Sequence, residues 1–151
     1  MVDSRQKGAR AENEAKGLLR RHTDLPWERV PGSGALSAQH KLKGDLYVPE
    51  HKNVYCVEVK HYKEDHLTSK ILTDKTPQVS KWWEQAERQA KQVGQLPLLI
   101  FKFDRSKFFV AFRSTETIID YRYLYYNEED ILIAKLEDWL KFEDPRFVKA
   151  Q

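Results

Sequence analysis

Hydrophobic and polar positions follow a helical period in three parts of this chain. Residues 7–22 place small and apolar side chains three and four positions apart, which predicts an amphipathic helix that ends before Pro26. The same period runs over residues 77–93 and stops at Gly94, a residue suited to ending a helix. A third helical pattern, with many acidic residues on its polar side, covers residues 128–142.

The other apolar segments predict strands, because Val, Ile, Tyr and Phe are frequent in them and turn residues bound them. The strongest strand pattern covers residues 53–62. Further strands are expected at residues 27–30, 45–48, 96–103 and 107–113, of which the last two form a hairpin. The order helix, three strands, helix, two strands, helix predicts an α/β domain with a central mixed sheet flanked by helices. Residues 114–127 show no clear period.

Length and cysteine content restrict the class of protein. The 151 residues suit a single domain, residues 1–151, and the lone Cys56 excludes an internal disulfide and a zinc site built from cysteines. No apolar run approaches the roughly 20 residues of a membrane helix, and no apolar segment typical of a signal peptide follows the N-terminus. We therefore expect a cytoplasmic protein, in the host cytoplasm if it is viral, without a membrane partner.

The formal net charge of +3 is unevenly distributed along the chain. Residues 1–113 contain 21 Lys and Arg against 14 Asp and Glu, whereas residues 114–151 contain 5 against 9. The chain thus has a basic body, residues 1–113, and an acidic C-terminal extension that includes a predicted helix. A basic body favours a polyanionic partner such as nucleic acid, although a solvated surface of uneven charge is an equal alternative.

The candidate chemistry lies on the predicted strand at residues 53–62. Alternation places Glu58 and Lys60 on one face of this strand, and charged side chains in an apolar strand need a pairing partner or a function. Asp45 begins the preceding strand, so antiparallel pairing would place it beside Glu58. Adjacent carboxylates repel, and a divalent cation resolves this. The oxygens of Asp45, Glu58 and the Val59 carbonyl suit Mg²⁺ or Mn²⁺.

Two more side chains extend this hypothesis towards phosphodiester hydrolysis. Lys60 is a cation that would orient a water or stabilise transition-state charge. Glu12 lies at the edge of the apolar stripe of the first helix, where it would face the same site. The plainer alternatives are an ion pair between Glu58 and Lys60 in a sheet, and a helix-surface pair between Glu12 and Lys16.

Four short motifs, in order, resemble a known nuclease family. They are Lys7-Gly8-Ala9-Arg10-Ala11-Glu12, Arg29-Val30-Pro31-Gly32-Ser33, Gly44-Asp45 and Glu58-Val59-Lys60. Together they resemble the archaeal-type Holliday junction resolvases of the PD-(D/E)xK nuclease superfamily, over about residues 5–113. The Asp…Glu-x-Lys part is shared across restriction and repair nucleases, whereas the helix motif and the turn motif are more specific to the junction resolvases.

The resemblance implies a restriction-endonuclease-like fold and a metal-dependent endonuclease that resolves four-way DNA junctions by paired symmetric nicks. It implies that Asp45 and Glu58 are direct ligands of Mg²⁺, or Mn²⁺ as a substitute, and that Glu12 completes the metal site. Lys60 matches the catalytic lysine, and Ser33 matches a residue of a loop that closes over the scissile strand. The expected DNA contacts are Lys7, Arg10, Arg29, Ser33, Lys41, Lys43 and Lys63.

The expected partners are branched DNA and a second copy of the chain, and no small-molecule substrate is expected. A two-fold dimer would place one site on each of two symmetric strands. We expect part of the interface to come from aromatic residues, which outnumber the needs of one small core; the alternative is that all of them are core. These residues are Trp82, Trp83, Phe101, Phe103, Phe108, Phe109 and Phe112.

Two other functions remain open at this point. One is a PD-(D/E)xK nuclease that acts on duplex or branched DNA in restriction or repair. The other is a DNA-binding module without catalysis. Clustered acids argue against the second, because they repel phosphate unless a metal is present.

Overall fold

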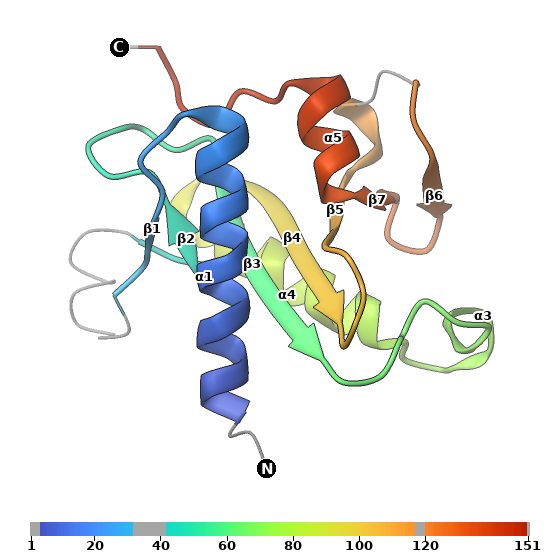
Figure 1. Ribbon diagram of the computed structural model, residues 1–151. Coiled ribbons are helices and arrows are strands. Elements are labelled where there is room, and N and C mark those ends of the chain that lie inside the picture. The colour runs from blue at the N-terminus through green and yellow to red at the C-terminus, as the bar shows by residue number, and fades with distance from the viewer. Residues whose placement is uncertain (1–3, 32–41, 117–119, 151) are drawn as a thin grey trace.

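A seven-stranded mixed sheet forms the centre of the computed structural model, which describes residues 4–31, 42–116 and 120–150 (Figure 1). The strand order is β1-β2-β3-β4-β5-β7-β6, with β3 and β4 parallel and each other neighbouring pair antiparallel. The elements are α1 (Ser4–Thr23), β1 (Glu28–Arg29), β2 (Leu46–Tyr47), β3 (Tyr55–Tyr62), α3 (Lys70–Thr73), α4 (Gln78–Val93), β4 (Leu96–Phe103), β5 (Phe109–Arg113), the 3₁₀-helix η1 (Ser114–Glu116), β6 (Tyr123–Tyr126), β7 (Ile131–Lys135) and α5 (Leu136–Glu143). The predicted α/β class, with a mixed sheet flanked by helices, is confirmed.

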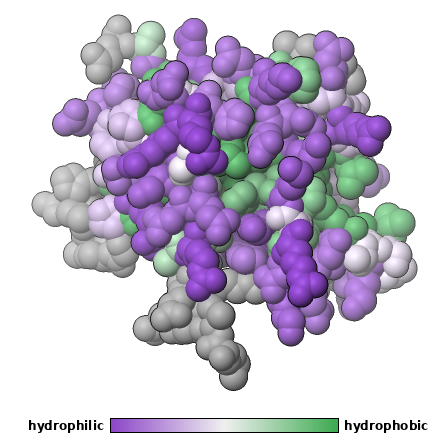
Figure 2. Space-filling view, in the orientation of Figure 1, coloured by the Kyte–Doolittle hydropathy of each residue, from purple (hydrophilic) through white to green (hydrophobic). Residues whose placement is uncertain are grey.

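Helices cover both faces of the sheet. Helices α1 and α5 pack on one face, and α4, which connects the parallel strands β3 and β4, packs on the other (Figure 1). Seen from the side of α1, the surface is mostly hydrophilic, and apolar side chains gather beside α1 over the sheet (Figure 2). No helix in the described part of the chain is long and apolar enough to cross a membrane.

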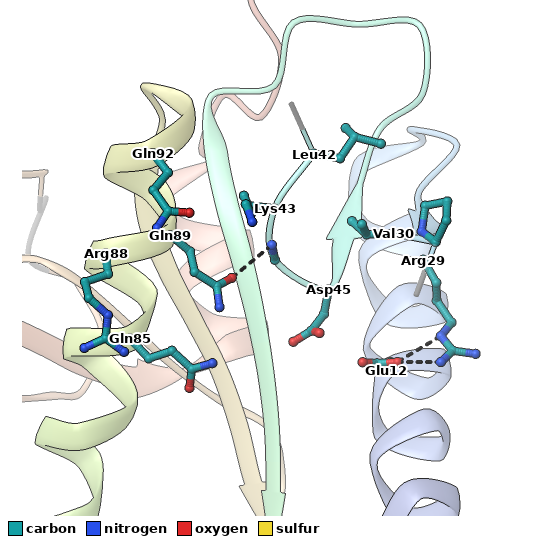
Figure 3. Close-up of a pocket in the computed structure, with 12 residues that line it drawn as sticks. Glu12, Arg29, Val30, Leu42, Lys43, Asp45, Gln85, Arg88, Gln89 and Gln92 are labelled. Carbon is teal, nitrogen blue, oxygen red and sulfur yellow. Dashed lines mark hydrogen bonds and ion pairs between the residues drawn. The ribbon is translucent and has the colours of Figure 1, made fainter. Parts of the chain in front are cut away.

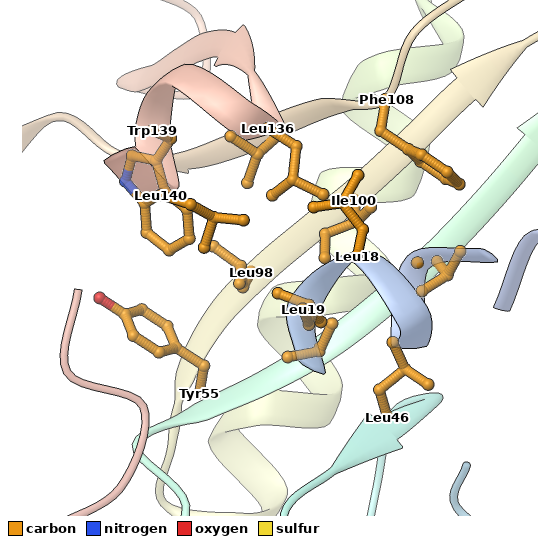
Figure 4. Packing of buried hydrophobic residues seen from close by; sticks show 14 of the residues in the cluster. Leu18, Leu19, Leu46, Tyr55, Leu98, Ile100, Phe108, Leu136, Trp139 and Leu140 are labelled. Atoms are coloured by element: carbon orange, nitrogen blue, oxygen red, sulfur yellow. The ribbon is translucent and has the colours of Figure 1, made fainter. Parts of the chain in front are cut away.

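Strand β4 divides its side chains between two apolar clusters. Leu98 and Ile100 face α1 and α5, where they pack with Leu19 and Leu136 (Figure 4). The intervening Leu99 faces α4 with the other cluster. A strand buried on both faces needs an apolar side chain at nearly every position, which explains the unbroken apolar run in this part of the sequence.

The C-terminal segment differs from its prediction. Residues 128–142 do not form one helix: Ile131–Lys135 is β7, and the helix α5 covers only Leu136–Glu143. Strand β6 lies within the segment that showed no period. Because β7 lies between β5 and β6 and both of its faces are covered, its side chains from Ile131 to Ala134 are all buried, and such a run imitates part of a helical stripe.

The prediction that aromatic side chains supply a dimer interface is wrong for six of the seven residues on which it was based. Trp82, Trp83, Phe101, Phe103, Phe108 and Phe112 are at most 9% exposed, and Phe109 is half-buried. Covering a sheet on both faces needs more aromatic volume than a core on one face would. These residues therefore form the core of one chain.

Candidate active site

A tight turn at Gly44 brings Asp45 to the edge of β3. The φ angle of Gly44 is +84°, and a Cβ atom at this position would lie 2.6 Å from the carbonyl oxygen of Val57. Glycine is therefore required by both backbone conformation and space. The Asp45 N–H donates to the Val57 carbonyl at 2.7 Å, and Leu46 pairs with Val57 in antiparallel register. The expected antiparallel pairing of these two strands is confirmed.

The Asp45 carboxylate is oriented by the backbone of β3. Its Oδ2 accepts a hydrogen bond from the Val59 N–H at 2.7 Å. Because the N–H and C=O of one strand residue point to the same neighbour, the Val59 carbonyl faces the side on which Asp45 lies. Glu58 is only 3% exposed, and its Oε2 lies 4.0 Å from the Nζ of Lys60. The sheet thus places two carboxylates, a carbonyl oxygen and an ammonium group together.

The third acid, Glu12, reaches this place from α1. Its Oε2 accepts hydrogen bonds from Arg29 of β1, at 2.9 Å from Nε and 2.8 Å from the terminal nitrogen. The backbone N–H of Val30 donates to the Asp45 carbonyl at 2.9 Å, which ties β1 to the Gly44 turn. Glu12 and Asp45 are close enough for each to influence the ionisation of the other.

Burial and mutual repulsion make these acids hard to ionise. Burial, followed by the charge of Glu58, raises the pKa of Asp45 to about 6. Burial also raises the pKa of Glu58, against the opposing effect of Lys60. The pKa of Glu12 is raised first by burial and then by Asp45, with Arg29 opposing. The nearby cations do not compensate for the burial of three carboxyl groups, and a bound cation would do so.

The available donors fit a hard divalent cation. The Asp45 and Glu58 carboxylates and the Val59 carbonyl are all oxygen ligands, which Mg²⁺ and Mn²⁺ prefer. Among the described residues, no three His, Cys, Asp or Glu side chains are arranged to hold a metal by themselves. Waters and the backbone oxygen would therefore complete the coordination, a mode typical of Mg²⁺.

A hollow of about 510 Å³ opens beside Asp45, and helix α4 forms one of its walls (Figure 3). The opposite wall contains Glu12 and the residues from Arg29 to Pro31. Gln89 reaches from α4 to the Gly44 turn, where its Oε1 accepts the Gly44 N–H at 3.1 Å. The α4 residues at the hollow are Gln85, Arg88, Gln89 and Gln92.

Sequence reasoning missed this wall of α4. Its residues recur at i, i+3, i+4 and i+7, the spacing of one helical stripe, directly beside the apolar stripe of the same helix. That pattern was available in the sequence, but nothing in it showed which element the polar stripe faces.

The predicted DNA-binding residues are distributed around the molecule. Arg29 and Lys43 line the hollow, and both are exposed. Arg10 is exposed but lies about 200° around α1 from Glu12, so it faces away from the acids. Lys63 is exposed just beyond the end of β3. Ser33 and Lys41 lie outside the described residues, as does the side chain of Lys7.

Comparison with known proteins identifies the class. Over residues 3–148, the chain matches the protein family described as "Phage putative PDDEXK endonuclease". The chain belongs to this family, and the predicted PD-(D/E)xK nuclease class and fold are thereby confirmed.

Two particular proteins resemble the chain. Protein D14 of Escherichia phage T5 is 41% identical over 148 residues, an alignment that covers 92% of each chain. Among solved structures, the chain is similar to Archaeoglobus fulgidus Hjc, a Holliday junction resolvase from an archaeal hyperthermophile. That comparison has a TM-score of 0.46 and 15% identity, and covers 93% of this chain and 98% of the other.

Proposed function

We propose that this nuclease is a metal-dependent DNA endonuclease that resolves four-way junctions by paired symmetric nicks. The observation that supports it most is the placement of the buried Glu58 and the half-buried Asp45 around the Val59 backbone with Lys60 beside them, in a chain of an endonuclease family. A binding module without catalysis has no use for carboxyl groups whose pKa values are raised by burial.

Each residue has a separate task in this proposal. Asp45, Glu58 and the Val59 carbonyl would hold Mg²⁺, for which Mn²⁺ could substitute, and Glu12 would complete the site through a water. The cation supplies Lewis-acid stabilisation of the charge that develops on the scissile phosphate. Lys60 donates a hydrogen bond to the attacking water or to a phosphate oxygen, and so adds a second positive charge at the reacting group.

The choice of a branched substrate rests on the sequence motifs. The Lys-Gly-x-x-Ala-Glu helix and the Arg-x-x-Gly-Ser turn resemble junction resolvases more narrowly than the acids do. Junction resolution requires two cuts, and the described residues of one chain form one such site, so we propose that a two-fold homodimer is the active form. We place its action in the cytoplasm of a phage-infected cell, since the relative that is 41% identical is a phage protein.

The deciding experiment offers the enzyme several DNA shapes at once. An immobile four-way junction, a linear duplex, splayed arms and single strands are incubated with Mg²⁺, with Mn²⁺ or with chelator. We expect symmetric nicks near the crossover of the junction, and no cutting in chelator. Preferential cutting of the linear duplex would instead assign the chain to the restriction or repair nucleases of the superfamily.

Variants test the residues. Glu58→Gln and Lys60→Ala should each lower the cleavage rate by about a thousandfold or more, since metal-assisted charge stabilisation supplies several kcal/mol. Junction binding should persist, because it depends on basic residues elsewhere. Glu64→Gln, an exposed acid beyond the end of β3, is the matched control and should cut normally. Full activity in the Glu58 or Lys60 variant would refute this assignment.

A further inference from the structure

The polar stripe of α4 at the hollow is almost uncharged. It is made of the amide side chains of Gln85, Gln89 and Gln92, here called the amide stripe, with Arg88 as its single charge. The rest of the exposed surface of α4 is charged, for example at Lys81, Glu84 and Lys91. Charged residues make up 32% of the chain, so three neighbouring amide side chains beside the candidate catalytic acid Asp45 call for an explanation.

Gln89 joins this stripe to the site. Its Oε1 accepts the Gly44 N–H at 3.1 Å, and Asp45 is the next residue along the turn. An amide side chain also carries two N–H donors, which remain available for other partners when the oxygen is occupied. Gln85 and Gln89 project from α4 towards the side on which Asp45 lies (Figure 3). The contact therefore sets the distance between the stripe and the acid.

The charges around the hollow explain why amides suit this wall. Glu12 and Asp45 both line the hollow and repel phosphate, and the Arg29 guanidinium is paired with Glu12. A Lys or Arg in place of Gln85 or Gln89 would pair with the acids and compete with a cation for them. Amide N–H groups donate to phosphate and sugar oxygens without neutralising the carboxylates.

We propose that the amide stripe binds the sugar–phosphate backbone of one DNA strand beside the scissile bond. In this arrangement Gln85 and Gln92 donate hydrogen bonds to the strand and Arg88 contacts one phosphate. Gln89 is a positioning residue that holds the Gly44 turn. The hollow of about 510 Å³ has the volume of a small-ligand pocket, which suits a short stretch of one strand. The inference rests on the proposed function and adds a DNA-binding surface to it.

The binding test compares two pairs of substitutions, one on the amide stripe and one outside it. In a Glu58→Gln background, chosen to slow cleavage, and in chelator, the affinity for labelled junction is measured by fluorescence anisotropy at several salt concentrations. Gln85→Ala with Gln92→Ala should weaken binding about fivefold or more, at one or more lost hydrogen bonds, without changing the salt dependence. Lys91→Ala with Lys141→Ala, two exposed lysines outside the stripe, is the matched control and should change affinity less than twofold. Arg88→Ala should lower the salt slope by about one.

Generic electrostatic attraction predicts the opposite order, because only the lysine pair removes charge. A Gln85 and Gln92 double variant that is folded by circular dichroism and binds within twofold of its parent would overturn the proposal. So would a larger loss in the lysine pair than in the glutamine pair.

The positioning role has its own kinetic signature in the otherwise native enzyme. Gln89→Ala should lower kcat about tenfold, whereas Gln85→Ala and Gln92→Ala should raise KM with little change in kcat. Gln89→Glu keeps the acceptor for the Gly44 N–H and should retain more of the native kcat than Gln89→Ala. An effect of Gln89→Ala on KM alone would refute this role.

The outcomes separate this inference from the proposed function. If the native protein cuts no DNA with either cation but the glutamine pair still weakens binding, the proposed function fails and the amide stripe stands. If the native protein cuts junctions and the glutamine pair behaves like its parent, the function stands and the inference is overturned.

Discussion

The two ends of the seven-stranded sheet differ in how they are held together. At one end, β1 and β2 contain two residues each and lie next to the acids. Beyond β3, the strands β4, β5 and β7 contain eight, five and five residues and are buried between helices. The long strands are stabilised by apolar packing on both faces, whereas the short ones depend on single contacts around Gly44 and Arg29.

Strand β3 belongs to both ends. Its Val57 and Val59 pack in the apolar cluster under α1, while Glu58 between them belongs to the acid group. The packing of β4, β5 and β7, here called the apolar end, thus stabilises β3. At the opposite end, β1 and β2 add functional groups to β3 by specific contacts. This difference indicates that stability and activity should be separable by substitution, and four predictions test the separation.

The largest effect on stability is expected in the apolar end. Trp139 is 2% exposed and its ring contacts those of Tyr55, Phe112 and Phe147. Trp139→Ala should lower the free energy of unfolding by about 3–5 kcal/mol. Urea unfolding followed by circular dichroism measures the change. Phe142→Ala on the same helix, at a side chain 44% exposed, is the control and should cost less than about 1 kcal/mol. Equal losses of unfolding free energy in the two variants would contradict the stabilising role of the packing around Trp139.

The next effect distinguishes two glycines with positive φ. Gly44 (+84°) faces the Val57 carbonyl, whereas nothing lies within 4 Å of a Cβ at Gly94 (+67°). Gly94→Ala should cost about 1 kcal/mol in stability and leave cleavage unchanged. Gly44→Ala should in addition displace Asp45 and lower the cleavage rate about a hundredfold. Thermal unfolding and junction cleavage are measured on both variants, and normal cleavage by Gly44→Ala would show that the turn does not set the position of the acid.

A smaller effect concerns the ionisation of Asp45 in the metal-free protein. Its pKa is raised to about 6, so ionisation destabilises the folded state. The penalty is absent below the usual pKa of 3.8, grows as the pH rises to about 6, and then amounts to up to about 3 kcal/mol. In chelator at pH 7, Asp45→Asn should therefore raise the free energy of unfolding by about 2 kcal/mol, and at pH 4 it should not.

Urea unfolding at both pH values measures this difference. Asp65→Asn, an exposed acid in the segment after β3, is the control and should change stability little at either pH. Destabilisation by Asp45→Asn in chelator at pH 7 would contradict the conclusion that ionisation of Asp45 lowers the stability of the folded state.

The smallest effect compares two acids on α1. Glu12 faces Asp45 and pairs with Arg29, whereas Glu14 lies on another side of the helix, 3.6 Å from Lys102. If Glu12 completes the metal site as proposed, Glu12→Gln should lower the cleavage rate about tenfold. Glu14→Gln should leave the rate unchanged. Similar losses of cleavage rate in both variants would indicate that α1 affects cleavage only by supporting the structure.

The sequence by itself determined the elements with a clear local period. Helices α1 and α4, strand β3 and the hairpin of β4 and β5 all lie where the sequence predicts them. The helices have a spacing of 3.6, β3 is rich in Val and Tyr, and the polar break at residues 104–106 separates the two apolar runs of the hairpin. The predicted antiparallel pairing that brings Asp45 beside the strand of Glu58 is also confirmed, since pairing of adjacent strands is a short-range consequence of the chain, whereas the roles of these residues stay predictions.

Only the tertiary structure decided the rest. Strand β7 is covered on one face by the cluster that contains the adjoining helix α5 and on the other by the cluster that contains α4, and burial on two faces removes the alternation that marks a strand. The same coverage places the aromatic side chains inside one chain. The raised pKa of Asp45, the pairing of Glu12 with Arg29 and the contact from Gln89 to Gly44 all depend on groups 13 to 45 positions apart. Burial and charge act through space, so no local pattern could reveal them.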